Sequence, residues 1–530
     1  MNRTSIAAAV AVAAMSSIPL GLTAFGQDET DQRFGVVHFA TSCNETAQRR
    51  FDRGMRYQHS FWYQSSKEIF EDVLKADPEC GIAYWGIALS LLYNPHAPPP
   101  PANLPVGLAA LQKGKAVGAK TERERGYIDA LTVFYTDYDK VPHGARVQAY
   151  LKAMEALAQK YPDDDEAQIF YAITLNVAAS PKDKTYANQL KGAAILEPIF
   201  LRQPRHPGVA HYLIHLYDTP ALADRGLDAA RRYAAIAPSA PHALHMPSHI
   251  FTRVGDWDDS IASNIASARA AKDGKDFGEQ LHAMDYLVFA YLQESEDQKA
   301  QAVVAEMRTV AAEPDKFPGP YALAVGPARY AIERSDWKGA ADLEVRPSKF
   351  AYADAMTYFA RALGAARSGN PEAAKADMAK LIELRDKLRD AKDAYWTEQV
   401  DIQWQITNAW VLSAEGKHDD ALTAMSAAAD AEDKTEKHPV TPGSPAPARM
   451  LLGAMLLDRG MPREALVAFE AVFRKEPNRF NAIAGAAQAA ERLGDKAKAR
   501  DYYQKLTAIA SNADPVRPEL SAARKFLAQN

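Results

Sequence analysis

Residues 450–477, with the sequence MLLGAMLLDRGMPREALVAFEAVFRKEP, contain the pattern that decides the fold. Small residues stand at Gly453 and Ala465, where two helices must approach closely, and Phe469 comes from the second helix to fill the gap. The same spacing recurs further along the chain, at Ala487, Ala490, Gly494, Ala499, Tyr503 and Leu506. This recurrence predicts a helix–turn–helix unit that repeats along the chain.

The repeated pattern extends over most of the chain. Near the N-terminus it is carried by Gly54, Tyr57, Phe61, Ser66, Phe70, Val73 and Pro78. Residues 98–141 and 310–350 fit it poorly, so we expect longer helices or degenerate repeats there. The prolines at Pro98 to Pro101 cannot lie inside a helix, and we expect them to form a loop rather than a lid.

Equivalent positions recur at an interval of about 34 residues, which is the length of a tetratricopeptide repeat (TPR). The units resemble the TPR superfamily over most of residues 47–510. Segments such as FDRG (51–54), AYWG (83–86) and HMPSH (245–249) also resemble a group of exported bacterial repeat proteins. The resemblance implies an all-α fold, a TPR-like α-solenoid that winds as a right-handed superhelix, and it implies no particular activity. We expect N-terminal TPR-like repeats over 27–180, central histidine-rich repeats over 181–310 and C-terminal TPR repeats over 311–530.

The N-terminal segment, residues 1–26, has the features of a Sec-type secretory signal peptide. Arg3 supplies a positive start, an apolar stretch follows, and Ala24 and Gly26 are the small residues of a cleavage site. We therefore expect a periplasmic or secreted protein. The mature part has no run of 18 apolar residues, which argues against a membrane span. The net charge of −5, without a basic stripe, argues against nucleic acid as a partner.

The chain has two cysteines, Cys43 and Cys80, and both fall in the N-terminal region. An exported setting permits a disulfide between them. The alternative is two buried thiols. The expected compartment favours the disulfide.

Histidines are concentrated in the middle of the chain, where seven of the 13 lie between His206 and His282. His211 and His245 are one repeat length apart, and so are His215 and His249. In repeat register these are the fifth and ninth positions of two successive units. The second position is His242 in the latter of these units and His282 in the next. Asp218 occupies a twelfth position and Asp285 a fifth.

These positions share one helical face, because they are separated by three or four residues. The TPR resemblance implies that this face lines the concave groove of the superhelix. We therefore expect eight side chains to converge there: His211, His215, His242, His245, His249, His282, Asp218 and Asp285. Imidazole pairs four residues apart offer two nitrogens to one ion, and such ligands suit copper, zinc or iron. If the site is catalytic, Asp218 or Asp285 is the candidate proton acceptor.

Several observations favour simpler interpretations of these residues. Pro247 lies within the second pair and can kink its helix, and His206 precedes Pro207 in what reads as a loop. A filled groove would make the histidines structural. Glu166 can supply a further carboxylate, although its acidic neighbours are typical of a helix start.

Two classes of function remain open from the sequence. The first is a metal-binding superhelix that handles a transition metal or uses it in catalysis on a small ligand. The second is a scaffold of the cell envelope that binds a protein or peptide partner in its groove without metal. Motifs of nucleotide binding, serine hydrolases and HExxH metalloproteases do not occur, so no nucleotide cofactor is expected. Whether the protein is an enzyme is not decided.

Overall fold

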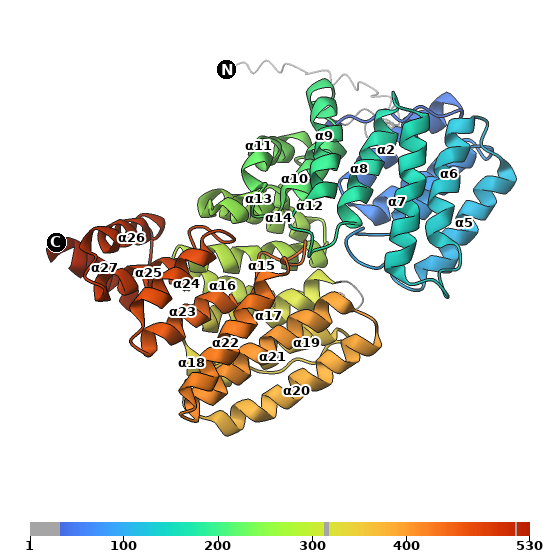
Figure 1. The fold of residues 1–530 in the computed structure, drawn as a ribbon. Coiled ribbons are helices and arrows are strands. Elements are labelled where there is room, and N and C mark those ends of the chain that lie inside the picture. Colours follow the sequence, from blue (N-terminus) through green and yellow to red (C-terminus); the bar gives the residue numbers. More distant parts are fainter. Residues whose placement is uncertain (1–31, 312–316, 515–516, 530) are drawn as a thin grey trace, which may run out of the picture.

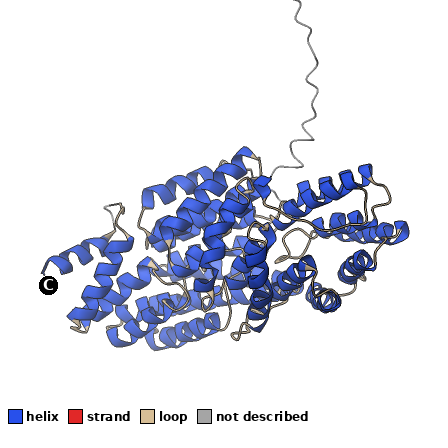
Figure 2. Ribbon diagram, turned by 90° about the horizontal axis from the view of Figure 1, so that it is seen from above, coloured by secondary structure: helices blue, strands red, loops and turns tan. Residues whose placement is uncertain are grey.

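Helices follow one another along almost the whole chain in a computed structural model that describes residues 32–311, 317–514 and 517–529 (Figure 1). The predicted signal peptide at residues 1–26 lies outside the described residues. Within them there are no strands, and loops join the helices (Figure 2). The predicted all-α fold is therefore confirmed. None of the described helices combines the length and the apolar character needed to span a bilayer.

The helices of the first third, after a short 3₁₀ turn at Gln32–Phe34, pair with their neighbours in sequence. They are α2 (Glu45–His59), α3 (Tyr63–Ala76), α4 (Gly81–Ser90), α5 (Asn103–Val117), α6 (Glu122–Tyr135), α7 (His143–Lys160), α8 (Asp165–Val177) and α9 (Ala187–Arg202). The region 98–141, which fits the repeat poorly, thus forms two helices, α5 with 15 residues and α6 with 14. The prolines at 98–101 lie in the connection between α4 and α5.

The central third has shorter helices. They are α10 (Pro207–Tyr217), the 3₁₀ turn η2 (Ala223–Gly226), α11 (Leu227–Ile236), α12 (Pro241–His245), α13 (Pro247–Val254), α14 (Trp257–Asp273), α15 (Phe277–Gln293) and α16 (Asp297–Met307). Pro247 begins α13, so the predicted kink appears as a break between two helices.

The last third returns to regular helix pairs. They are α17 (Pro318–Glu333), α18 (Trp337–Ala341), α19 (Ala351–Arg367), α20 (Pro371–Asp390), α21 (Ala394–Ala414), α22 (His418–Asp433), α23 (Ala448–Asp458), α24 (Pro462–Val472), α25 (Phe480–Arg492), α26 (Lys496–Ile509) and α27 (Pro518–Gln529). Between α17 and α19, the short α18 and a stretch without helix replace a full second helix, which explains the poor repeat pattern at 310–350.

Glycines set the close approach of helices at both ends of the solenoid. A Cβ atom on Gly453 would lie 2.8 Å from the Phe469 ring, and one on Gly54 would lie 2.8 Å from the Phe70 ring. Both distances are too short for a real side chain, so only glycine lets the aromatic ring fit against the backbone. The small-residue and aromatic spacing of the sequence is therefore confirmed as a packing rule of the repeats.

The loop of residues 434–447 between α22 and α23, hereafter the central loop, reaches the middle of the chain. The Val440 carbonyl oxygen accepts a hydrogen bond from His282 on α15 at 2.8 Å. Buried Arg329 of α17 donates to the carbonyl oxygens of Gly443 and Ser444 at 3.2 Å. Glu432 accepts from the Ala448 amide at 2.6 Å and so ties the two ends of the loop together.

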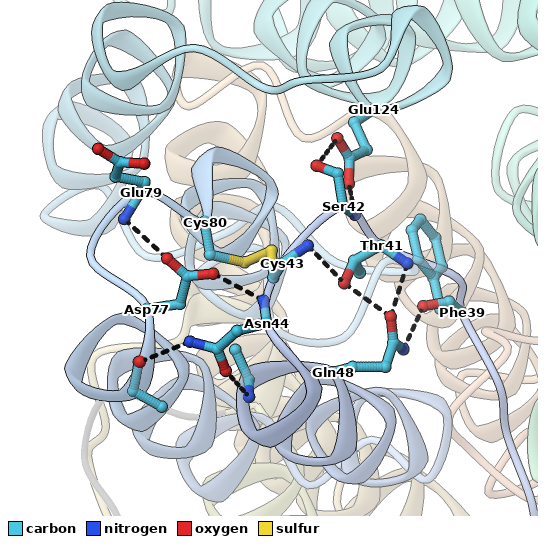
Figure 3. The surroundings of a disulfide bond; sticks show 12 residues. Phe39, Thr41, Ser42, Cys43, Asn44, Gln48, Asp77, Glu79, Cys80 and Glu124 are labelled. Carbon is cyan, nitrogen blue, oxygen red and sulfur yellow. Dashed lines mark hydrogen bonds between the residues drawn. A yellow bond between two sulfur atoms is a disulfide. The ribbon is translucent and has the colours of Figure 1, made fainter.

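A disulfide joins Cys43, just before α2, to Cys80 at the start of α4, with the Cα atoms 5.1 Å apart (Figure 3). Polar contacts hold the same two segments together. The side chain of Asn44 donates to the Ala76 carbonyl oxygen at 2.8 Å, and the backbone N–H of Asn44 donates to the Asp77 carboxylate at 2.8 Å. The disulfide therefore links two neighbouring repeats at a point where hydrogen bonds also hold their backbones together.

We expect a Cys43→Ser, Cys80→Ser double variant to fold with lower stability. The disulfide closes a loop with a sequence separation of 37 residues, and in the chain-entropy model its loss costs about 4 kcal/mol. Urea unfolding of the oxidised wild type and the double variant measures this difference. The reduced wild type is the control and should match the variant; equal stability of all three forms would contradict the prediction.

Glu432 makes the stability of the fold depend on pH. Burial raises its pKa from the ordinary 4.5 to about 7. Between these values the folded chain holds a proton that the unfolded chain has released, so stability is full below the unfolded pKa and falls as pH rises through the folded one. We expect the fall in the free energy of unfolding with rising pH to be smaller by on the order of 1 to 3 kcal/mol in Glu432→Gln. Urea unfolding at pH 5 and pH 8 tests this, with exposed Glu464→Gln as the control; an unchanged pH dependence in Glu432→Gln would contradict it.

Candidate metal centre

Three histidines from two successive repeats form the first cluster, here called trio A. His211 and His215 lie one turn apart on α10, and His242 is the second residue of α12. Nε2 of His211 is 3.1 Å from Nε2 of His215. The three residues offer ligand atoms that lie within 4.8 Å of one another.

The second cluster, trio B, repeats this arrangement one unit later. His245 ends α12, His249 lies on α13, and His282 lies on α15. The break at Pro247 does not separate the pair, because Nε2 of His245 is 3.0 Å from Nε2 of His249. Ligand atoms of the three residues again lie within 4.8 Å of one another.

Each trio thus combines the fifth- and ninth-position pair of one repeat with the second-position histidine of the next. The six histidines named from the sequence come together, but in two groups of three rather than around one point. The repeat register in the sequence predicts the two fifth- and ninth-position pairs. The division into trios arises because His242 and His282 reach back to the preceding repeat.

The outward nitrogens of three of these imidazoles are held by fixed hydrogen-bond acceptors. Nδ1 of His211 donates to the backbone oxygen of His59 at 2.7 Å, and Nδ1 of His249 donates to Asp218 at 2.9 Å. Nδ1 of His245 donates to the side-chain oxygen of Asn264 at 2.7 Å. The amide of Asn264 is itself oriented, because its nitrogen donates to a backbone oxygen at 2.7 Å.

The second-position histidines are anchored in the same way. Nδ1 of His242 donates to Glu279 at 3.0 Å, and Nε2 of His282 donates to the Val440 oxygen at 2.8 Å. Their other nitrogens, Nε2 of His242 and Nδ1 of His282, are buried and make no hydrogen bond. Nδ1 of His282 lies 3.9 Å from the Glu279 carboxylate.

These anchors fix the tautomers, because carbonyl and carboxylate oxygens only accept protons. Five of the six rings therefore turn an unprotonated nitrogen inward. In trio B the two facing Nε2 atoms, of His245 and His249, both carry lone pairs. The Tyr286 hydroxyl lies 3.3 Å from Nε2 of His249. Among the described residues, only His249 forms a hydrogen-bond contact with Nε2 of His245. This pattern of outer acceptors and inward lone pairs is the one that metal-binding histidines have.

Burial keeps four of these imidazoles neutral. It lowers the pKa of His249 to about 3, against the opposing hydrogen bond from the ring to Asp218. It also lowers the pKa of His211, His215 and His245 well below the ordinary value. A proton is therefore poorly suited to neutralise the repulsion between the facing lone pairs at neutral pH.

The histidines are enclosed. All six are between 0% and 7% exposed. The central loop lies across the α15 side and the connection after α4 approaches the α10 side, which the sequence does not predict. The ring of His96, in that connection, lies 4.5 Å from the ring of His215, measured between centroids.

Asp218 and Asp285, the two candidate proton acceptors, have different surroundings. Asp218 ends α10 and contacts His249, Arg253 at 2.8 Å and Lys437 at 2.7 Å. Although burial raises it, the two cations hold the pKa of Asp218 well below its usual range. Asp218 is thus a weak base that orients His249. Asp285 lies 3.4 Å from Arg329 and belongs to neither trio.

A third buried group combines His59, Glu166 and His206. One Glu166 oxygen is 3.0 Å from Nε2 of His59, and the other is 2.9 Å from Nε2 of His206. The outer nitrogens also have partners, because the Tyr212 hydroxyl is 3.0 Å from His59 and the Val209 amide donates to His206. His206 precedes α10, as the sequence indicates, and its side chain caps the helix. With all its polar atoms paired, this group supports α10 and the His59 oxygen that anchors His211.

A cavity of about 410 Å³ reaches the centre from outside. Its lining includes His215, Asp218, Lys437, His96 and His438. The last two are histidines from loops, and the sequence does not single them out because they follow no repeat register. Glu279 and Asn264 are missed for a related reason: a single carboxylate or amide on a helix carries no periodic signal.

Comparison with known proteins identifies the repeat. Residues 481–512 match the family model of the tetratricopeptide repeat. This match covers one repeat unit, formed by α25 and α26. No curated protein matches it in sequence.

Two solved structures show what this chain is similar to in fold. The Cut9–Hcn1 hetero-tetramer of the APC/C is similar over 91% of this chain and 96% of that chain, with 12% identity and a TM-score of 0.30. The human IFIT1 dimer with PPP-AAAA is similar over 81% of this chain and 90% of that chain, with 11% identity and a TM-score of 0.38.

We expect Asp218→Asn to destabilise the fold by about 3 to 5 kcal/mol, because it leaves Arg253 and Lys437 buried without their counter-charge. Asp228→Asn is the matched control, since Asp228 is 72% exposed in its pair with Arg232 and such surface pairs contribute about 0.5 kcal/mol or less. Urea unfolding of both metal-free variants measures the difference. Equal stability of the two variants would show that Asp218 does not neutralise these cations.

Proposed function

We propose that the protein binds transition-metal ions through trio A and trio B, one ion in each. The observation that carries the proposal is the pair of facing nitrogens in trio B, 3.0 Å apart and both unprotonated. A cation between them turns this repulsion into two coordinate bonds. The buried, unpaired nitrogens of His242 and His282 complete a set of three donors in each trio.

The type of ion follows from the donors. Neutral imidazoles suit copper, zinc or iron, whereas magnesium and calcium prefer oxygen ligands. Three protein ligands also leave a coordination position free, which is the arrangement of catalytic rather than structural zinc sites. The cavity beside His215 gives a small ligand access to that position. Metal-dependent catalysis is therefore part of the proposal, along with metal handling.

We also propose that the protein works outside the cytoplasm, in the periplasm or after secretion. The disulfide between Cys43 and Cys80 supports this location, since such bonds persist in oxidising compartments. Metal would then be acquired outside the cytoplasm.

The test is metal content of protein that has no histidine tag, after equilibration with copper, zinc or iron and removal of loosely bound ions. We expect the wild type to retain metal and a His211→Ala, His245→Ala double variant to bind at least about 100-fold more weakly, because each trio loses a ligand. His418→Ala, at the start of α22, is the matched control. Undiminished metal in the double variant, with its helix content intact, would overturn the proposal.

A second candidate function is a scaffold that binds a protein or peptide. A hollow beside α21 and the central loop favours it, because Tyr321, Tyr395 and Trp396 line it together with Asp433 and Glu436. Aromatic side chains with acidic neighbours suit a basic peptide segment. A pull-down that is insensitive to chelator and is lost in Trp396→Ala would support this function. Capture that persists in Trp396→Ala would exclude this hollow as its site.

A further inference from the structure

Trio A and trio B lie nearly as close to each other as the rings within each trio. The centroids of His215 and His249 are 6.0 Å apart, and those of His242 and His245 are also 6.0 Å apart. Within trio A, the rings of His211 and His215 are separated by 4.8 Å. The six imidazoles thus form one continuous cluster, which is close enough for two ions to share a small ligand.

Glu279 connects the two trios. Its carboxylate accepts a hydrogen bond from His242 of trio A at 3.0 Å and lies 3.9 Å from Nδ1 of His282 in trio B. These three residues by themselves offer ligand atoms within 4.8 Å of one another. One partly buried side chain therefore contacts both trios.

The charges around the cluster balance before any metal is added. Three carboxylates and three cations lie around it. Asp218 contacts Arg253 and Lys437, and it also contacts His249. Asp285 contacts Arg329, and Glu279 contacts His242. Each of these carboxylates thus has a cation or a histidine as its partner. These groups therefore offer no excess of negative charge to offset added ions.

This balance favours ions of low charge. The cost of burying an ion rises with the square of its charge, and two divalent ions here would add four uncompensated charges. Copper, zinc and iron all bind imidazole, but only copper has a stable monovalent ion. Three neutral nitrogens also satisfy the low coordination number of Cu(I).

We propose that trio A and trio B form one dinuclear copper centre that binds dioxygen between two Cu(I) ions. This inference rests on the proposed metal-binding function and adds the metal, its oxidation state and the class of ligand. In the binding step each Cu(I) gives up one electron and becomes Cu(II). One dioxygen molecule accepts both electrons and is reduced to the level of peroxide, so the electrons balance without another reductant.

The surroundings suit such a step. Dioxygen is small and apolar, and the cavity that reaches His215 gives it a path to the cluster. The Tyr286 hydroxyl, 3.3 Å from Nε2 of His249, lies beside the ligand set. The low exposure of the six histidines keeps bulk water from the reduced oxygen, which favours retention over release.

The experiment uses the full chain, reconstituted with Cu(I) without oxygen, freed of loosely bound copper and then exposed to air. We expect two copper ions and the uptake of one dioxygen molecule per chain. The Cu(II) resonance should be nearly absent after oxygenation, because two neighbouring Cu(II) spins couple. Competition with zinc should leave copper in the centre.

A His282→Gln variant separates one dinuclear centre from two independent sites. Glutamine keeps a donor for the Val440 oxygen but removes a ligand of trio B. We expect about one copper per chain, at least a tenfold loss of dioxygen uptake, and the resonance of an isolated Cu(II) ion after chemical oxidation. His418→Ala should behave as the wild type. The wild-type measurement decides the matter even if His282→Gln does not fold.

The outcomes separate this inference from the proposed function. Two retained ions with two isolated Cu(II) resonances, no dioxygen uptake, or replacement of copper by zinc would overturn the dinuclear copper centre and leave metal binding intact. A folded wild type that retains no metal would overturn both.

Discussion

The centre depends on hydrogen bonds that point away from it. An imidazole has two nitrogens on opposite sides of its ring, so an acceptor that fixes one of them decides where the other points. Backbone oxygens of His59 and Val440, the amide of Asn264 and two carboxylates provide these acceptors, and they come from separate helices and loops. The geometry of the inward nitrogens is therefore a property of the tertiary structure rather than of a local motif.

The repeat architecture supplies the duplication. One helix–turn–helix unit places a histidine pair, the next places a third histidine, and the same step along the superhelix produces trio B from trio A. Burying so many polar rings costs free energy unless each finds a partner. The fold meets most of that cost with the outer acceptors, but the inward nitrogens remain. In the proposed function a bound cation offsets this remaining cost, so that metal binding and stability are coupled.

The sequence predicts much of this structure, and its failures have identifiable causes. The repeat period yields the solenoid, the pairing of small residues with Phe70 and Phe469, and all six histidines. It does not yield His96, His438 or Lys437, because these belong to connections that lie outside any repeat. The enclosure of the histidines is not predicted for the same reason. Periodicity describes how a helix faces its neighbours, whereas the cover over the histidines comes from a distant loop, in which Val440 follows His282 by 158 residues.

The position of the central loop has a consequence for biogenesis. All six histidines have emerged once the chain has passed His282, but Val440 and Lys437, which lie over them, follow much later. A growing or translocating chain therefore exposes these histidines before the segment that covers them exists. In the proposed function, this order leaves an interval in which an ion has access to the histidines before Arg329 and Glu432 fix the central loop in place.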